Sequence, residues 1–239
     1  MELAKQCIDV GLFTNRLDEM RAFYGEQIKL PYESMLPLGG GMRQYRYGML
    51  GSVLKINHAR DPLPPRRAGG YLRLTISDRR VIAPFVFADP DGNQVGLVPS
   101  GQRGIDQIEV QLGVTDESAF AQFYGEVLGA ERIGTNRCKI GESIVSFVKD
   151  SAVVRIDKTG PMSTMEAMAT MRAVGLGYIT IQVRDCDAAH QSMLSKGAWE
   201  GSAPTTLGEI ARISFIRDPD GNFIEISQRA AEGAPLPKG

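Results

Sequence analysis

Polar side chains alternate with apolar ones along short segments of the chain that are typical of β-strands. The segment FIEIS has Glu225 between two isoleucines, and YITIQV has Tyr178, Thr180 and Gln182 at the same period of two. Because successive strand residues point to opposite faces of a sheet, the polar side chains of each strand share one face. A carboxylate that accepts a proton beside a phenol that donates one suits acid–base chemistry. Such a face is either a solvated sheet surface or the lining of a pocket.

Two further segments of the second half show the same alternation. QIEVQL places Gln107 and Glu109 opposite its apolar residues, and VVRID leaves Arg155 and Asp157 together on one face. In FIEIS the aromatic Phe223 shares the face of the carboxylate. The second half of the chain is therefore predicted to carry a polar inner sheet face.

Repeated motifs indicate which elements position these strands. The turn sequence DPDGN occurs at residues 89–93 and 218–222, and segments 7–30 and 104–130 share a strand–turn–helix pattern with the letters FYGE. Pro, Asp, Gly and Asn are the residues that tight turns require, so DPDGN predicts a hairpin. The repeats predict an α+β chain of four β-α-β-β-β units, the second too short for its helix. The units span 7–60, 69–99, 104–158 and 176–228.

The composition is that of an ordinary folded protein. The chain has 239 residues, a formal net charge of −1 and three scattered cysteines. It has no apolar run of the roughly 20 residues that a membrane helix needs. We expect neither nucleic acid nor a membrane as partner, and no disulfides. The first residues lack a signal-peptide pattern, so a cytoplasmic location is expected.

Two connections between the units also have a distinct composition. A loop rich in Pro and Arg (ARDPLPPRRAGG) joins the first two units. The segment STMEAMATMRAVG predicts a helix between the last two, and its methionines, spaced three apart, favour packing or an adaptable lid.

Units of this kind that close on DPDGNxIE resemble the vicinal oxygen chelate superfamily, which includes glyoxalase I, extradiol dioxygenases and bleomycin-resistance proteins. The resemblance covers nearly the whole chain. It implies that pairs of units curl mixed sheets into cups that hold a divalent metal or a ligand. We therefore expect two glyoxalase-like domains, a degenerate one at 1–103 and one with the active cup at 104–239.

The resemblance also implies positions for metal ligands, on the first and last strands of each unit. In the second half these positions are Gln107, Arg155, Tyr178 and Glu225. Gln107 and Glu225 match the usual residue types, and they would be the ligands of any Fe, Mn, Zn or Ni ion. Arg155 repels a cation and a neutral tyrosine is a poor ligand, so no cofactor is expected.

The first half has a still poorer set at the same positions. Its equivalents are Asp9, Lys55, Tyr71 and Gly96. A lysine and a glycine do not favour a metal, and the missing helix suggests a scaffold or lid role for this half. Of the two DPDGN hairpins, the second is thus expected to keep the functional carboxylate.

Without a metal, the four residues of the second half are expected to converge in one cup as catalysts. Glu225 would be the general base, while Tyr178, helped by Arg155 and Gln107, would stabilise an oxyanion. We expect an isomerase or lyase that acts on a small, largely apolar keto or phenolic compound. The residues expected to bind this substrate are Glu109, Thr180, Gln182 and Phe223.

Several alternatives stay open at this point. One is a metal-dependent extradiol dioxygenase or glyoxalase-like enzyme with Glu109 as a substitute ligand, although the only histidines, His58 and His190, do not fall at ligand positions. Another is a non-catalytic protein that binds a drug or other ligand. A third is a purely structural ion pair between Arg155 and Glu225. Relatives often dimerise, so a homodimer is an alternative to a monomer.

Overall fold

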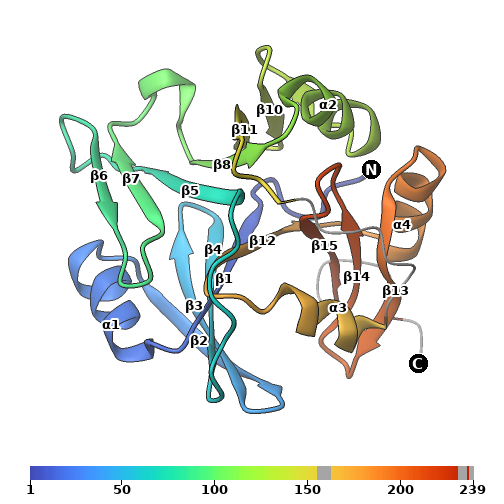
Figure 1. Ribbon diagram of the computed structural model, residues 1–239, viewed down its shortest axis with the longest axis horizontal. Coiled ribbons are helices and arrows are strands. Elements are labelled where there is room, and N and C mark those ends of the chain that lie inside the picture. Colours follow the sequence, from blue (N-terminus) through green and yellow to red (C-terminus); the bar gives the residue numbers. More distant parts are fainter. Residues whose placement is uncertain (155–162, 231–235, 237–239) are drawn as a thin grey trace.

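The strands form two mixed sheets, here called sheet 1 and sheet 2, in a computed structural model that describes residues 1–154, 163–230 and 236 (Figure 1). In spatial order, sheet 1 consists of β13 (Trp199–Leu207), β14 (Ala211–Arg217), β15 (Phe223–Arg229), β12 (Gly175–Gln182), β1 (Asp9–Thr14), β4 (Ser52–Ala59), β3 (Met42–Met49) and β2 (Tyr32–Gly39). Sheet 2 consists of β6 (Phe85–Ala88), β7 (Gln94–Val98), β5 (Gly70–Ser77), β8 (Ile108–Val114), β11 (Ser143–Lys149), β10 (Arg137–Ile140) and β9 (Glu131–Arg132). The α+β class and the two cupped sheets of glyoxalase-like units are confirmed.

Helices are few and short in the described residues. They are α1 (Leu17–Arg21), α2 (Glu117–Gln122), α3 (Thr164–Met171) and α4 (Cys186–Ser195), with a 3₁₀ turn at Gln102–Gly104. Helices α1 and α2 continue into π-helical turns, Ala22–Gln27 and Phe123–Val127, which contain the two FYGE motifs. Asp116 caps α2 by accepting hydrogen bonds from two backbone amides, and Ser163 forms a capping box with Glu166 at α3, as those sequences favour.

Among the described residues, no helix has the length and apolar character to cross a bilayer.

The two sheets pair units across the halves of the chain. In sheet 1, β1 of the first unit pairs antiparallel with β12 of the fourth, and in sheet 2, β5 of the second unit pairs antiparallel with β8 of the third. The expectation that 1–103 and 104–239 each form their own cup is therefore wrong. The chain accordingly stays in sheet 2 between β7 and β8, whereas it passes from one sheet to the other after β4 and again after β11.

The second and third units end differently from one another. The second has three strands and no helix in residues 78–84, as predicted. The third closes on β11, not on the predicted strand VVRID: Val153 and Val154 lie outside any strand, and Arg155 and Asp157 lie outside the described residues. The reason is a tight turn at Gly141, whose φ of +58° suits glycine and lets β11 follow β10 directly, so the unit is complete at Lys149.

One buried apolar cluster joins the two sheets. It includes Leu54 of sheet 1, Leu74 and Val110 of sheet 2, Met20 of α1 and Phe120 of α2. Because strand residues alternate between faces, the polar residues next to these point away from the shared core. Each sheet therefore turns its polar face away from the other sheet.

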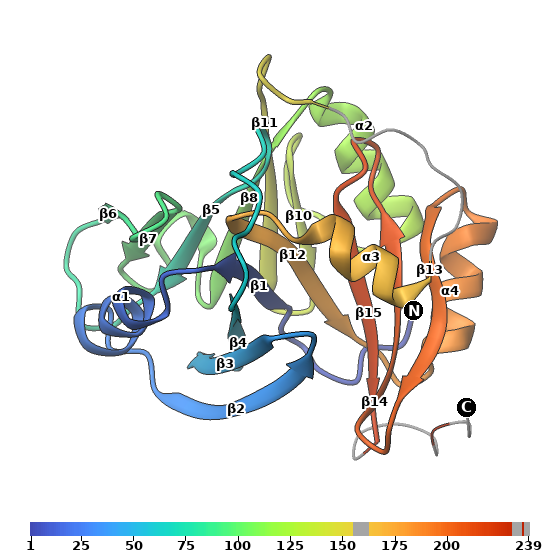
Figure 2. The same ribbon diagram turned by 60° about the horizontal axis from the view of Figure 1, so that its bottom comes forward.

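Helix α3 covers the polar face of sheet 1. Ala167 and Met171 of this helix join Phe13, Tyr178 and Phe223 of the sheet in a second buried cluster. The helix packs mainly on β13 and β14, at the end of sheet 1 where Figures 1 and 2 show it. Lys55, Thr180 and Glu225 on this face are buried as well, so the face is not a solvated sheet surface.

Candidate active site

The centre of the sheet 1 cup holds a buried ion pair between Lys55 of β4 and Glu225 of β15. Lys55 Nζ lies 3.2 Å from Glu225 Oε2 and donates to Thr180 Oγ1 at 2.6 Å. Thr180 in turn donates to Glu225 Oε2 at 3.0 Å. Strand register creates this triangle, because Thr180 is the direct partner of Glu225 and β1 alone separates β4 from β12.

This lysine is held in an environment that opposes its charge. The side chains of Lys55 and Glu225 are 2% and 10% exposed. Burial lowers the pKa of Lys55, and the nearby carboxylate of Glu225 counteracts that effect. The result is a desolvated cation fixed beside a carboxylate.

Tyr178 forms the adjoining wall of the cup. Its hydroxyl accepts a hydrogen bond from Asn57 Nδ2 at 3.2 Å, and Lys55 Nζ lies 5.5 Å from the ring centroid, within reach of a cation–π contact. Burial raises the pKa of the Tyr178 phenol, with the Glu225 charge adding to the rise, so the phenol stays protonated at neutral pH. The ring packs directly on Gly11, where an added Cβ would lie 2.1 Å from Tyr178 Cε1.

Asp9 lies at the far end of this polar row and is fully engaged. Its Oδ1 accepts from Lys5 Nζ at 2.6 Å and from the Val53 amide at 2.8 Å, and its Oδ2 accepts from Gln182 Nε2 at 2.8 Å. The opposite end of the cup is apolar. Its buried side chains are Phe13, Met42, Ala59, Tyr178, Ala211, Ile213, Phe215 and Phe223, with Ala167 and Met171 from α3.

The donor set of this cup does not fit a divalent metal. With the units paired as observed, the family's ligand positions in sheet 1 are Asp9, Lys55, Tyr178 and Glu225. The Lys55 ammonium is within 3.2 Å of Glu225 and would repel a cation there, and the oxygens of Asp9 are taken by other donors. No three His, Cys, Asp or Glu side chains in the described parts of the chain are grouped to hold a metal.

The sequence predicted that Gln107 would lie beside Glu225, but the two residues lie at different sheets. Gln107 precedes β8 of sheet 2, where its amide donates to Ser52 Oγ at 2.7 Å and accepts from Ser143 Oγ at 2.6 Å. Glu109 is in the same sheet and forms an ion pair with Arg137 at 3.0 Å. Both residues were misplaced because their unit pairs with the second unit and not with the fourth.

The remaining predicted site residues are placed as follows. Tyr178, Thr180, Gln182, Phe223 and Glu225 share the sheet 1 cup, while the prediction for Arg155 falls outside the described residues.

Sequence reasoning missed three residues of the site, namely Asp9, Lys55 and Asn57 of the first unit. The segment VLKINHA alternates in the same way as FIEIS, which could have shown that Lys55 and Asn57 share a polar face. The first half was set aside as a scaffold because its lysine does not suit a metal. That same lysine is the partner of the carboxylate.

Two cupped mixed sheets of β-α-β-β-β units, each with polar residues inside, define the glyoxalase-like class of fold. Residues 104–226 match the family model of the Glyoxalase/Bleomycin resistance protein/Dioxygenase superfamily, so the chain belongs to this superfamily.

Individual relatives are distant. A protein from Vibrio parahaemolyticus named probable lactoylglutathione lyase is 27% identical over 135 residues, which cover 54% of this chain and 94% of that protein. The crystal structure of glyoxalase I from Zea mays aligns over 93% of this chain and 92% of its own, with a TM-score of 0.67 and 13% identity. At that identity the likeness to the solved structure establishes the fold and leaves the reaction open.

Proposed function

We propose that this protein is an enzyme that moves protons on a small keto or phenolic compound without a metal ion, in the cup of sheet 1. The observation that carries the proposal is the buried Lys55–Glu225 pair. It places a fixed positive charge and a carboxylate base side by side, at positions from which relatives of this fold bind a metal. A lysine ammonium can stabilise a developing oxyanion electrostatically, as a divalent ion would.

The roles of the residues follow from their chemistry. Glu225 would take a proton from the carbon next to a carbonyl, and the enolate oxygen that forms would accept hydrogen bonds from Lys55 and from the Tyr178 hydroxyl. Return of the proton from Glu225 to a neighbouring carbon completes an isomerisation. Loss of a leaving group from that carbon would instead complete a lyase reaction.

The walls of the cup indicate the kind of substrate. Phe215 and Phe223 lie at the apolar end, and Met171 of α3 packs over them. A largely apolar molecule with one reactive oxygen would suit this combination of an apolar wall and a single polar cluster. Since α3 covers the cup, substrate binding would require this helix to shift.

The test begins with a thermal-shift screen of apolar keto and phenolic compounds. Hits are then incubated in D₂O, and deuterium uptake at the carbon next to the carbonyl or hydroxyl is followed by NMR. Loss of general base catalysis in Glu225→Gln should slow uptake by about 10²–10⁴-fold. Tyr178→Phe keeps the ring and should slow uptake less. Glu209→Gln, at an exposed position, is the matched control and should behave as wild type.

Metal dependence is tested on the same preparation. Protein purified without chelator should contain no stoichiometric Fe, Mn, Zn or Ni, and dialysis against EDTA should leave its activity unchanged. A stoichiometric metal that is lost in Glu225→Ala would overturn the proposal and favour a glyoxalase-like or dioxygenase reaction.

One observation favours a second candidate, a non-catalytic ligand-binding protein. The polar groups of the cup already satisfy one another, since Lys55, Thr180 and Glu225 form a closed set of hydrogen bonds. In that case a screened compound would bind, would be recovered without deuterium, and would bind Glu225→Gln about as well as wild type.

A further inference from the structure

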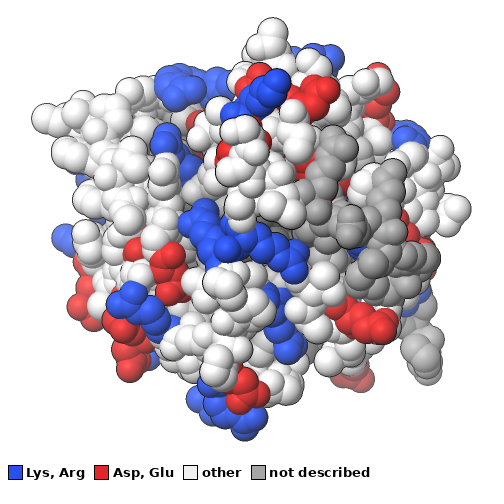
Figure 3. Space-filling model, viewed as in Figure 1, with Lys and Arg blue, Asp and Glu red and all other residues white. Residues whose placement is uncertain are grey.

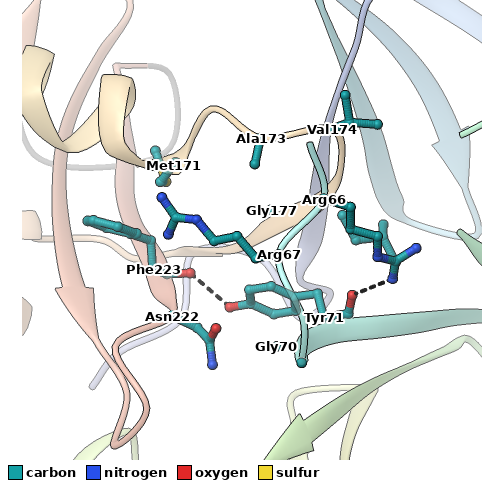
Figure 4. A pocket seen from close by; sticks show the side chains of 12 residues that line it. Arg66, Arg67, Gly70, Tyr71, Met171, Ala173, Val174, Gly177, Asn222 and Phe223 are labelled. Atoms are coloured by element: carbon teal, nitrogen blue, oxygen red, sulfur yellow. Dashed lines mark hydrogen bonds between the residues drawn. The ribbon is translucent and has the colours of Figure 1, made fainter. Parts of the chain in front are cut away.

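The Pro- and Arg-rich connection between β4 and β5 borders a cavity outside both polar cups. The cavity has a volume of about 580 Å³, and its charged and amide side chains are Arg66, Arg67, Arg73, Gln94, Gln111 and Asp150. A smaller cavity of about 50 Å³ adjoins it and shares Arg66 and Arg67 (Figure 4). Figure 3 shows Lys and Arg side chains gathered in a band in the middle of this face of the molecule.

The three arginines have no carboxylate partner within 4.0 Å in the described residues. Arg73 donates to the amide oxygen of Gln94, and Arg67 donates to the backbone carbonyl of Thr170. A guanidinium has five N–H donors, and because Arg67 is exposed, its other donors are open to solvent or to a ligand. Partial burial lowers the pKa of Arg67, although the residue as a whole is exposed.

Arg66, unlike Arg67 and Arg73, uses its guanidinium to hold the loop in place. It donates to the backbone carbonyls of Gly92 and Tyr71 at 3.1 and 3.2 Å, which ties the connection to the first DPDGN turn. The loop then passes close to Asn222, which requires glycine: Gly70 has φ of +67°, and an added Cβ would lie 2.6 Å from Asn222 Oδ1. Arg67 is therefore held over the cavity by a fixed loop. Figure 4 shows its side chain extending across the smaller cavity toward Met171.

The charges around the larger cavity are complementary to those of a dianion. Three guanidinium groups and the single carboxylate of Asp150 leave a net charge of +2. Phosphate groups carry about −1.5 to −2 charges at pH 7, and the planar guanidinium fork matches their oxygens in pairs. We propose that the space where these two cavities meet is a binding site for a phosphate group, with Arg67, which lines both cavities, and Arg73 as its ligands and Arg66 as the residue that positions the loop.

The site is tested by isothermal titration of the full chain with inorganic phosphate at low ionic strength. Wild type should bind one phosphate with a Kd of about 1 mM or tighter, and Arg67→Gln should bind about tenfold or more weakly, since a charge-assisted hydrogen bond is lost. Arg43→Gln, an exposed arginine outside the cavity, should bind as wild type. Arg73→Gln gives a second, independent loss.

Titrations with other anions distinguish a phosphate monoester from free phosphate. They also test whether the site requires a doubly charged anion. Tighter binding of phenyl phosphate than of inorganic phosphate would identify a phosphate monoester as the ligand, and equal binding would identify free phosphate. Acetate should bind far more weakly. The proposal is overturned if wild type binds no phosphate, if acetate binds equally well, or if Arg43→Gln weakens binding as much as Arg67→Gln. The phosphate titration needs no substrate of the sheet 1 cup, so its outcome is independent of the proposed enzyme.

Discussion

At the scale of single residues, Lys55 and Glu225 depend on one another because both are buried. Two desolvated charges are stable only as a pair, and the loss of one leaves the other without compensation. The pair can act in catalysis only if a substrate oxygen replaces the contact that Lys55 and Glu225 now make with each other. Stability measurements can therefore establish the pair before any substrate is known.

We predict that Lys55→Met destabilises the fold by about 3–5 kcal/mol, the usual cost of leaving a buried charge unpaired. The double variant Lys55→Met/Glu225→Gln should recover a large part of this loss, because no net charge then remains. Urea unfolding followed by circular dichroism measures both. Equal stability of wild type and Lys55→Met would show that Glu225 is solvated and that the pair is incidental.

The two DPDGN turns differ in the environment of their first aspartate. Asp89 Oδ2 accepts a hydrogen bond from the Tyr24 hydroxyl of the first FYGE motif at 2.8 Å. Asp218 accepts its hydrogen bonds from Asp220 and Asn222 of its own turn. Burial raises the pKa of Asp218 to about 7, against the opposing effect of the Asn222 hydrogen bonds. The second turn is therefore expected to hold a proton that the unfolded chain releases.

This difference predicts a pH dependence of stability. The folded state binds a proton at Asp218 more tightly than the unfolded state, whose carboxyl has its ordinary value of 3.8. The stabilisation is thus fully present below about pH 4 and is lost as pH rises to about 7. Asp218→Asn mimics the protonated form and should remove this decline. Urea unfolding of both proteins from pH 4 to 8 measures it, and a stability difference that stays constant with pH would contradict the prediction.

At the scale of elements, α3 links the fold to the site. The methionine spacing predicted either packing or a lid, and the two roles separate along the helix. Met171 is 5% exposed and packs in the cluster over the cup, whereas Met165 is 64% exposed. The capping box at Ser163 stabilises the start of this helix independently of the cup. The helix is thus anchored by few buried contacts, which suits an element that shifts to admit a substrate.

We predict that Met171→Ala destabilises the protein by about 2–5 kcal/mol, through lost burial and a cavity above Phe223. Met165→Ala on the same helix is the matched control and should change stability little, because its side chain is in solvent. Thermal unfolding of the two variants compares them directly. Equal effects would mean that α3 does not pack on the cup in solution.

At the scale of the whole molecule, each sheet combines strands from both halves of the chain. The outer units, first and fourth, form sheet 1, and the inner units form sheet 2, so neither half contains a complete cup. Residues from positions as distant as Lys55 and Glu225 meet only because β1 and β12 are neighbours. The segment that matches the family model, 104–226, supplies four of the eight strands of sheet 1 and four of the seven strands of sheet 2.

This arrangement predicts that residues 104–239 expressed alone do not form the native monomer. The fragment would leave the edges of β12 and β8 unpaired, and unpaired edges favour association with other strands. Size-exclusion chromatography with light scattering and near-UV circular dichroism should show association or loss of tertiary structure. Coexpression with residues 1–103 should restore a stable complex. A fragment that is monomeric and has a native near-UV spectrum would contradict the observed pairing of units.

Local patterns were sufficient for the parts of this protein that depend on neighbours in the chain. The DPDGN turns, the missing helix of the second unit, the helix that begins near Ser163 and the polar face of FIEIS could all be predicted from the sequence. Their physical causes are turn geometry, capping and strand alternation, which act over a few residues. The end of the third unit was mispredicted because VVRID alternates as a half-buried strand does, whereas SIVSFVK, which forms the strand, does not alternate.

The sequence by itself thus determined the four units, their turns and which side chains share a strand face. Only the tertiary structure decided which units pair, and with them the partner of Glu225. Pairing depends on contacts between residues more than a hundred positions apart, such as Gly11 with Tyr178, and on connection lengths that several arrangements could satisfy. The sequence placed every catalytic residue in the second half of the chain, whereas the structure adds Lys55 of the first half. The reason is that strand alternation orients a side chain but does not determine which strand lies beside it.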